Sequence, residues 1–116
     1  MHELSIALSI VDLVTAEALS HGAATVSRVE VGLGSHSGVV PEALEFAMAE
    51  AVKNTLLEHA RIDYRLIEAG SMCHDCGLSF VPDDVYAPCP QCGNPMPELV
   101  RGKELIVNSI DIETIK

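Results

Sequence analysis

The chain has 116 residues, a length that fits one ordinary domain, and a formal net charge of −10 from 17 acidic and 7 basic side chains. Because phosphate binding rests on lysine and arginine, a chain this acidic is a poor candidate for binding nucleic acid or an anionic membrane surface. Hydrophobic residues make up 48% of the sequence but aromatic residues only 3%, so the core must be aliphatic.

The first residues do not have the pattern of a secretion signal. There is no basic segment at the start, and Glu3 and Asp12 interrupt the apolar run. No apolar stretch is long enough to span a membrane. We therefore expect a cytoplasmic protein. Thiols are kept reduced there, so the four cysteines favour a metal site over two disulfides.

The first elements predicted along the chain are a helix and a strand. Residues 3–20 repeat apolar side chains at helical spacing, and Gly22 follows as a left-handed cap. The predicted buried face of this helix consists of Leu4, Ala7, Leu8, Val11, Val14 and Ala18. Residues 25–33 then alternate, which predicts a half-buried strand. Its inner side chains are predicted to be Val29, Val31 and Leu33.

A second helix is predicted from Pro41 to about residue 59, because proline at a first helical turn loses no hydrogen bond. Its predicted buried face consists of Leu44, Ala47, Met48, Ala51 and Leu56. Alternation predicts two more strands, over residues 62–66 and 103–112. Their inner side chains are predicted to be Ile62, Tyr64 and Leu66 in one, and Ile106, Ile110 and Ile112 in the other.

Residues 71–101 differ in character, since they hold all four cysteines and most of the prolines, with little periodicity. We interpret this segment as an insert that a metal holds together, because it has few side chains large enough to build a core. The predicted fold class is α+β, a small three-stranded sheet with two helices plus a four-cysteine, zinc-ribbon-like insert. The predicted domains are residues 1–70 with 102–116, and residues 71–101.

The cysteines form two matching pairs, Cys73-x2-Cys76 and Cys89-x2-Cys92, with twelve residues between them. One tight turn aims both sulfurs of a pair at a single metal, and two such turns close a tetrahedron of thiolates. A glycine follows each pair, where the turn needs a permissive backbone. Four protein ligands leave no open position for water, so we expect a structural zinc ion and no hydrolytic chemistry.

Other interpretations of the cysteines stay open at this point. The two turns also resemble those of rubredoxin, where four cysteines hold an electron-transfer iron, although that leaves the first seventy residues unexplained. A redox dithiol is a further alternative. The insert would instead be a zinc-ribbon adaptor if its only task were to bind other proteins. His74, inside the first pair, is interpreted as an exposed spacer.

The amino terminus offers a second set of metal ligands in Met1, His2 and Glu3. The terminal amine, the amide nitrogen of His2 and its imidazole form adjacent chelate rings around one metal, and Glu3 adds an amide nitrogen or a carboxylate oxygen. Nitrogen and oxygen donors in a plane suit Ni(II) or Cu(II). Taken alone, a histidine at position two is usually incidental, so this pattern does not establish a site.

Several segments, taken together, point to a known family. They are the opening Met-His-Glu-Leu-Ser-Ile-Ala, the sequence Val-Glu-Val-Gly at 29–32, Gly-Val-Val-Pro-Glu-Ala-Leu at 38–44, the two CxxC pairs, and Lys-Glu-Leu at 103–105. In this order and at this length they resemble the HypA/HybF family of nickel chaperones for [NiFe]-hydrogenase maturation. The resemblance covers essentially the whole chain.

The resemblance implies that nickel binds weakly through His2 and nearby backbone nitrogens, with Glu3 contributing, while zinc stays in the four-cysteine insert. It implies a protein that is not an enzyme, works with the GTPase HypB and hands nickel to the precursor of the hydrogenase large subunit. Some relatives also serve urease. Some place a carboxylate near position 40, where this chain has Val40; Glu42 and His36 are the candidates to replace it.

Overall fold

The computed structural model describes residues 2–114 of the chain, and the side chains from Glu3 to Thr114. The chain divides into two compact units. The first consists of Met1–Gly32, Val39–Arg65 and Ile106–Lys116, and the second of Leu33–Gly38 and Leu66–Leu105. The domain bounds expected from the sequence, which change after residues 70 and 101, stay a prediction.

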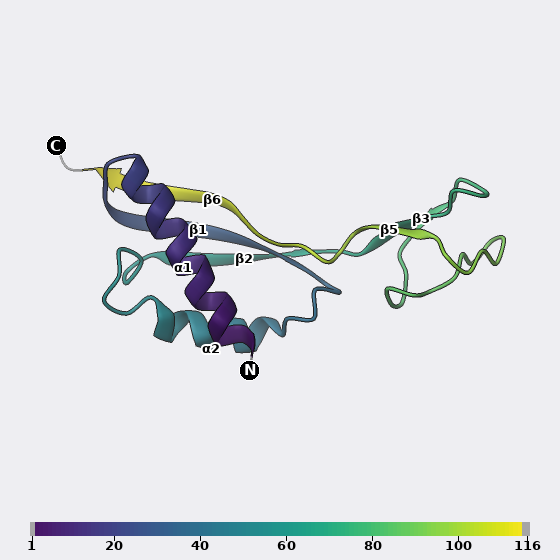
Figure 1. Ribbon diagram of the computed structural model, residues 1–116, viewed down its shortest axis with the longest axis horizontal. Coiled ribbons are helices and arrows are strands. Elements are labelled where there is room, and N and C mark those ends of the chain that lie inside the picture. Colours follow the sequence, from purple (N-terminus) through teal and green to yellow (C-terminus); the bar gives the residue numbers. More distant parts are fainter. Residues whose placement is uncertain (1, 115–116) are drawn as a thin grey trace. The chain divides into compact units, whose positions relative to one another are not determined.

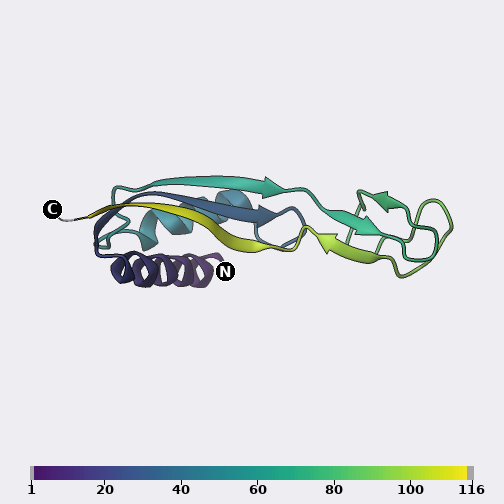
Figure 2. The ribbon, with the colours of Figure 1, turned by 90° about the horizontal axis from the view of Figure 1, so that it is seen from above.

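Two helices and a three-stranded sheet carry the first unit (Figures 1 and 2). The helices are α1 (His2–Ser20) and α2 (Pro41–Ala51), and the strands are β1 (Ala23–Gly34), β2 (Arg61–Ile67) and β6 (Leu105–Thr114). The strand order is β2-β1-β6. The helices pack against each other and cover one face of the sheet. The α+β arrangement expected from the sequence is therefore confirmed.

Helix α1 ends where the sequence predicts. The N–H of Gly22 bonds to the carbonyl of Leu19 at 3.0 Å, and Gly22 takes a φ of 75°, which glycine adopts without steric cost. The predicted buried face is only partly right, because Leu4 and Leu8 are 50% and 48% exposed, while Ile10 is buried. The remaining predicted residues are buried: Ala7, Val11, Val14 and Ala18. The apolar stripe of α1 is wider than the face that packing covers.

Helix α2 is shorter than predicted. It ends at Ala51, and a series of turns replaces the helix expected up to residue 59. Asn54 takes a φ of 63°, which a right-handed helix cannot contain, and the Thr55 hydroxyl donates to the carbonyl of Val52 at 2.7 Å. In these turns Leu57, not the predicted Leu56, is fully buried. On α2 itself three predicted core residues are buried: Leu44, Ala47 and Met48.

One face of β1 is buried. The side chains of Val29, Val31 and Leu33 on that face are fully buried, as predicted. The edge strands are less regular. Leu66 is 64% exposed and Ile106 is 46% exposed, so both predictions of inward-facing side chains are wrong.

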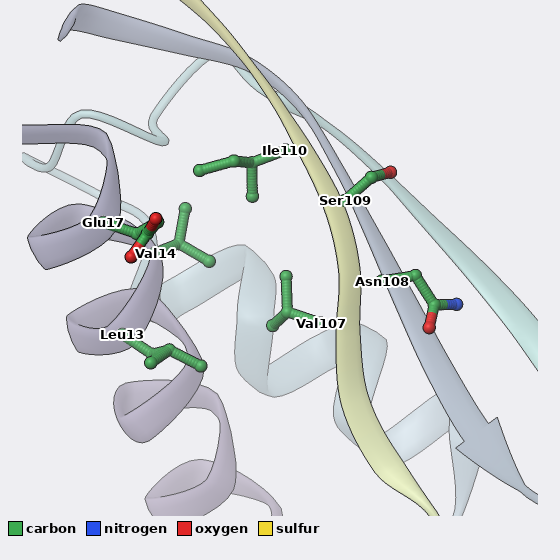
Figure 3. A pocket seen from close by; sticks show the side chains of 7 residues that line it. All are labelled: Leu13, Val14, Glu17, Val107, Asn108, Ser109 and Ile110. Carbon is green, nitrogen blue, oxygen red and sulfur yellow. The ribbon is translucent and has the colours of Figure 1, made fainter. Parts of the chain in front are cut away.

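Figure 3 shows the reason in β6, where the side chains of Val107 and Ile110 both point toward α1 while those of Asn108 and Ser109 point away. Val107 and Ile110 lie on one face of β6 although two residues separate them, so the strict alternation of a strand is broken here. Ile106, which is next to Val107 on the other face, therefore cannot share a face with Ile110.

The second unit contains a smaller antiparallel sheet of order β4-β3-β5. Its strands are β3 (Gly70–Met72), β4 (Ser79–Phe80) and β5 (Glu98–Arg101). Such short strands leave little periodicity in the sequence, which is why they were not predicted. The sheet supports the two cysteine turns, and this agrees with the expected zinc-ribbon-like insert. None of the helices formed by residues 2–114 is long and apolar enough to cross a membrane.

Candidate metal centre

The fold brings the four cysteines of the second unit into one cluster. The sulfur atoms of Cys73, Cys76, Cys89 and Cys92 all lie within 4.8 Å of one another. Across the pairs, Sγ of Cys73 lies 3.5 Å from that of Cys92, and Sγ of Cys76 lies 3.7 Å from that of Cys89. Within the described part of the chain, no other group of three or more histidine, cysteine or acidic side chains comes together in this way.

Two turns of the same geometry hold the sulfurs. In the first, the N–H of Cys73 donates to the carbonyl of Leu78 at 2.9 Å, and the N–H of Gly77 donates to the carbonyl of Cys73 at 2.8 Å. The same two bonds recur around Cys89, at 2.9 and 3.0 Å. Gly77 and Gly93 take φ values of 80° and 75°, so each turn uses the glycine that follows its cysteine pair.

Backbone N–H groups inside the turns point at the first sulfur of each pair and favour its charged form. The N–H of Cys76 lowers the pKa of Cys73 to about 6, against burial, with help from Asn94, whose side-chain nitrogen lies 3.6 Å from Sγ of Cys73. In the second turn the N–H of Cys92 lowers the pKa of Cys89 in the same way. Thiolate, not thiol, is the form that binds a metal.

The thiol of Cys92 has its pKa changed in the opposite direction. The N–H of Asn94 lowers the pKa, but the hydrogen bond with Cys73, burial and the two other cysteines together raise it to about 12. A cluster of sulfurs this close keeps protons between them unless a cation takes their place. Sulfur donors at this separation, with backbone N–H groups directed at them, fit a tetrahedral thiolate metal centre.

The cluster is buried on one side only. Cys73 and Cys89 are buried, Cys76 is half-buried and Cys92 is exposed. His74 is exposed and its Nε2 lies 2.6 Å from a carboxylate oxygen of Glu98, an arrangement consistent with the expected spacer role. The sequence reasoning did not single out Asn94. The only signal for it was its position directly after the second Cys-x2-Cys-Gly turn.

The amino-terminal site lies largely beyond what the structure describes. Met1 falls outside the described residues, as does the side chain of His2. Glu3 stands in the first turn of α1, and its pKa is lowered by hydrogen bonds that favour the carboxylate, with the backbone N–H of Val40 among the donors. The structure therefore brings Glu3 beside Val40, the residue that precedes α2.

The two candidates to replace a carboxylate at position 40 lie in different units. Glu42 is exposed in the first turn of α2, in the first unit. His36 belongs to the second unit, where its Nε2 lies 3.4 Å from the carbonyl oxygen of Pro82. Only Glu42 therefore shares a compact unit with Glu3 and Val40.

Residues 1–112 match the family described as "Hydrogenase/urease nickel incorporation, metallochaperone, hypA". The chain belongs to the HypA family. The resemblance inferred from the sequence is thereby confirmed. The match includes both the amino terminus and the cysteine cluster. HypA proteins are metallochaperones, accessory proteins of hydrogenase maturation, and are not enzymes.

Individual relatives agree with this assignment. A protein of Parabacteroides distasonis named "Hydrogenase maturation factor HypA" is 45% identical over 113 residues, which are 97% of this chain and 98% of the relative. A protein of the same name from Chlorobium limicola is 43% identical, over 97% of each chain. The solution structure of the Ni metallochaperone HypA from Helicobacter pylori is similar with a TM-score of 0.74 and 25% identity, covering 99% of this chain and all of that one.

Proposed function

We propose that this HypA family member carries Ni(II) at its amino terminus, through Met1, His2 and Glu3, and delivers it for [NiFe]-hydrogenase maturation. The observation that carries the proposal is the family match over residues 1–112, which begins at the Met-His-Glu terminus. The placement of Glu3 in the first turn of α1 supports it, since Glu3 directly follows the proposed nitrogen donors in the sequence.

A site at this place suits a metal that has to be released. The backbone N–H of His2 lies in the first turn of α1, where N–H groups have no partner within the helix, so its nitrogen is available once deprotonated. The partial positive charge at a helix N-terminus opposes a cation, and the carboxylate of Glu3 offsets that charge. Few fixed side-chain ligands, and the part of the helix field that Glu3 does not offset, favour weak, reversible binding.

The four cysteines, we further propose, hold a structural zinc ion. A closed set of four thiolates is typical of structural zinc, and it leaves no position for a substrate or for water. Four soft donors are also unsuited to a nickel cargo that must leave for another protein. In this proposal Cys73, Cys76, Cys89 and Cys92 keep their metal throughout the cycle of nickel binding and release.

We assign the delivery step to a HypB-type GTPase and to the precursor of the hydrogenase large subunit, with all of them in the cytoplasm. Support comes from the family description, which names hydrogenase and urease nickel incorporation. Support also comes from the four free cysteines, which a reducing compartment maintains. The proposed delivery of nickel involves neither nucleic acid nor a membrane.

Nickel titration of untagged protein tests the amino-terminal site. We expect about one Ni(II) per chain by isothermal titration calorimetry, and loss of this binding in His2→Ala. The matched control is His59→Ala, which removes an exposed histidine far along the chain and should leave nickel binding unchanged. Zinc content, measured by plasma mass spectrometry, should be one per chain in all three proteins. Unchanged nickel binding in His2→Ala would refute the site.

The same preparations distinguish the two alternative functions. A zinc-ribbon adaptor would show no specific nickel affinity, and a rubredoxin-like carrier would be a red iron protein with a reversible potential. The match over residues 1–112 favours the chaperone over both, because it includes the first unit, which neither alternative explains.

A further inference from the structure

Helix α2 presents an aromatic side chain to solvent. Phe46 is 77% exposed, although the chain has only two phenylalanines and an aliphatic core into which a phenylalanine would pack. Burying a phenylalanine side chain stabilises a fold, and the first unit gains little of this stabilisation from Phe46. Aromatic side chains, phenylalanine among them, are enriched at protein interfaces relative to the rest of the surface.

The neighbours of Phe46 on the helix define a surface. Residues three and four positions away lie next to it, and they are Glu42, Ala43, Ala49 and Glu50. Glu50 pairs with Lys53 at 2.6 Å, whereas Glu42 forms no ion pair within the described part of the chain. The surface is thus an aromatic anchor between small side chains, with carboxylates at both ends.

A groove continues this surface toward the sheet. It encloses about 200 Å³ between α2 and β2, most of the side chains that line it are apolar, and Glu45 is one of the two polar ones. The other residues that line it are Met48, Ala49, Val52, Ala60, Ile62 and Tyr64. Ala49 belongs both to the groove and to the neighbourhood of Phe46, so the two are continuous.

The charges at the groove indicate what it would accept. Burial and the charge of Glu45 raise the pKa of Tyr64 to about 12, which places that carboxylate near the phenol. Within the described residues Glu45 has no basic side chain paired with it. An arginine or lysine fits this groove, with its aliphatic stem on the apolar side chains and its cation at Glu45. A carboxylate side chain, or a second acidic chain, does not fit this groove, because Glu45 repels it.

We propose that the exposed face of α2, made of Phe46, Glu42, Glu45 and Glu50 with the adjoining groove, docks a protein partner that offers basic side chains beside an apolar surface. The net charge of −10 makes a second copy of this chain a poor occupant, because two such faces repel. Phe46 packs on that apolar surface, and one arginine or lysine of the partner enters the groove. This docking does not depend on nickel at the amino terminus.

Fluorescence anisotropy with a labelled synthetic peptide tests the proposal on the full, zinc-loaded chain. The peptide is an amphipathic helix of roughly 18 residues, about five turns, with leucine on one face and arginine beside it. Its counterpart has glutamate in place of arginine. We expect the basic peptide to bind and the acidic one not to bind. Phe46→Ala and Glu45→Lys should each weaken binding by about tenfold or more.

Two variants on α1 serve as matched controls. Leu13→Ala removes an apolar side chain that is 59% exposed, and Asp12→Lys makes the same charge change as Glu45→Lys at another exposed position. Both should bind the basic peptide within about twofold of the unchanged protein. The proposal is overturned if these controls weaken binding as much as Phe46→Ala, since that result means unspecific charge attraction.

Further outcomes overturn it as well. If the basic peptide does not bind, a basic, apolar partner is not the occupant of this face. If the acidic peptide binds equally well, the carboxylates do not select the partner. Sedimentation velocity examines the remaining occupant. If the unchanged chain self-associates and Phe46→Ala does not, a second copy occupies this face. Nickel titration of Phe46→Ala should be normal, so failure of docking and failure of nickel binding are separate results.

Discussion

Removal of the metal from the cysteine cluster should unfold the second unit and leave the first unit folded. The reason is the small core of the second unit. Among the described residues its buried apolar side chains are only Leu33, Ala69, Cys73, Pro82 and Cys89. The remaining buried hydrophobic residues of the chain lie in the first unit.

The magnitudes make the second unit dependent on its metal. Burial of Leu33, the largest of these side chains, contributes about 1.5–3 kcal/mol. A structural zinc ion bound by cysteines contributes ~10–16 kcal/mol at neutral pH. The ordering of the long connections between the short strands opposes folding by about 1 kcal/mol or more for each residue. Without the free energy of metal binding, the second unit cannot offset the entropy cost of ordering its chain.

Hydrogen exchange followed by NMR measures this prediction in each unit separately. After treatment with a strong chelator, the amides of Cys73 and Cys89, which are hydrogen-bonded in the folded turns, should exchange at rates typical of unfolded chain. Amides in the middle of β1 and α2 should stay protected. The variant Cys76→Ser should behave as the chelated protein does. Continued protection of Cys73 and Cys89 in the chelated protein would contradict the reasoning, as would loss of protection in both units together.

Three further predictions concern stability. Leu44→Ala, at a fully buried position of α2, should lower the free energy of unfolding, measured in urea, by about 2–5 kcal/mol. Phe46→Ala, on the exposed face of the same helix, should change it by less than ~0.5 kcal/mol. Equal losses would contradict the burial pattern. Gly102→Ala should cost about 1–3 kcal/mol more than Gly38→Ala, because both have positive φ but only at Gly102 would a Cβ lie 2.7 Å from neighbouring backbone. Hydrogen bonds from two arginines lower the pKa of Asp63 below its ordinary value of 3.8. The contribution of Asp63 to folding stability should therefore be fully present above that ordinary pKa and be lost as pH falls through the lower pKa of the folded state. The stability difference between the unchanged chain and Asp63→Asn should therefore shrink from pH 6 to pH 2, approximate limits that bracket the titration, and a constant difference would refute the pairing.

Much of the first unit could be predicted from the sequence because its signals are periodic. The alternation through Val29 and Val31 predicts a buried strand face, and both are fully buried. The exposed Leu4 and Leu8 show where such reasoning fails. An apolar side chain contributes to the pattern whether or not another element covers it, and the position of that element depends on tertiary packing.

Other features could not be predicted because their causes are not local. Helix α2 ends at Ala51 although the sequence allows a longer helix, since the positive φ at Asn54 is set by the turns that lead to β2. The strands of the second unit are too short to leave a pattern. The cysteine cluster, in contrast, was predictable in full, because the spacing within each pair dictates the turn and the two pairs match each other.

The most direct test of the proposed function is X-ray absorption at the nickel edge on the untagged chain loaded with one equivalent of Ni(II) and with zinc in place. The proposed site at Met1, His2 and Glu3 predicts a first shell of nitrogen and oxygen with imidazole scattering that disappears in His2→Ala. Thiolate sulfur in the nickel shell would contradict the proposal, because the thiolates of this sequence are those of its 4 cysteines. A spectrum that His2→Ala leaves unchanged would contradict it equally.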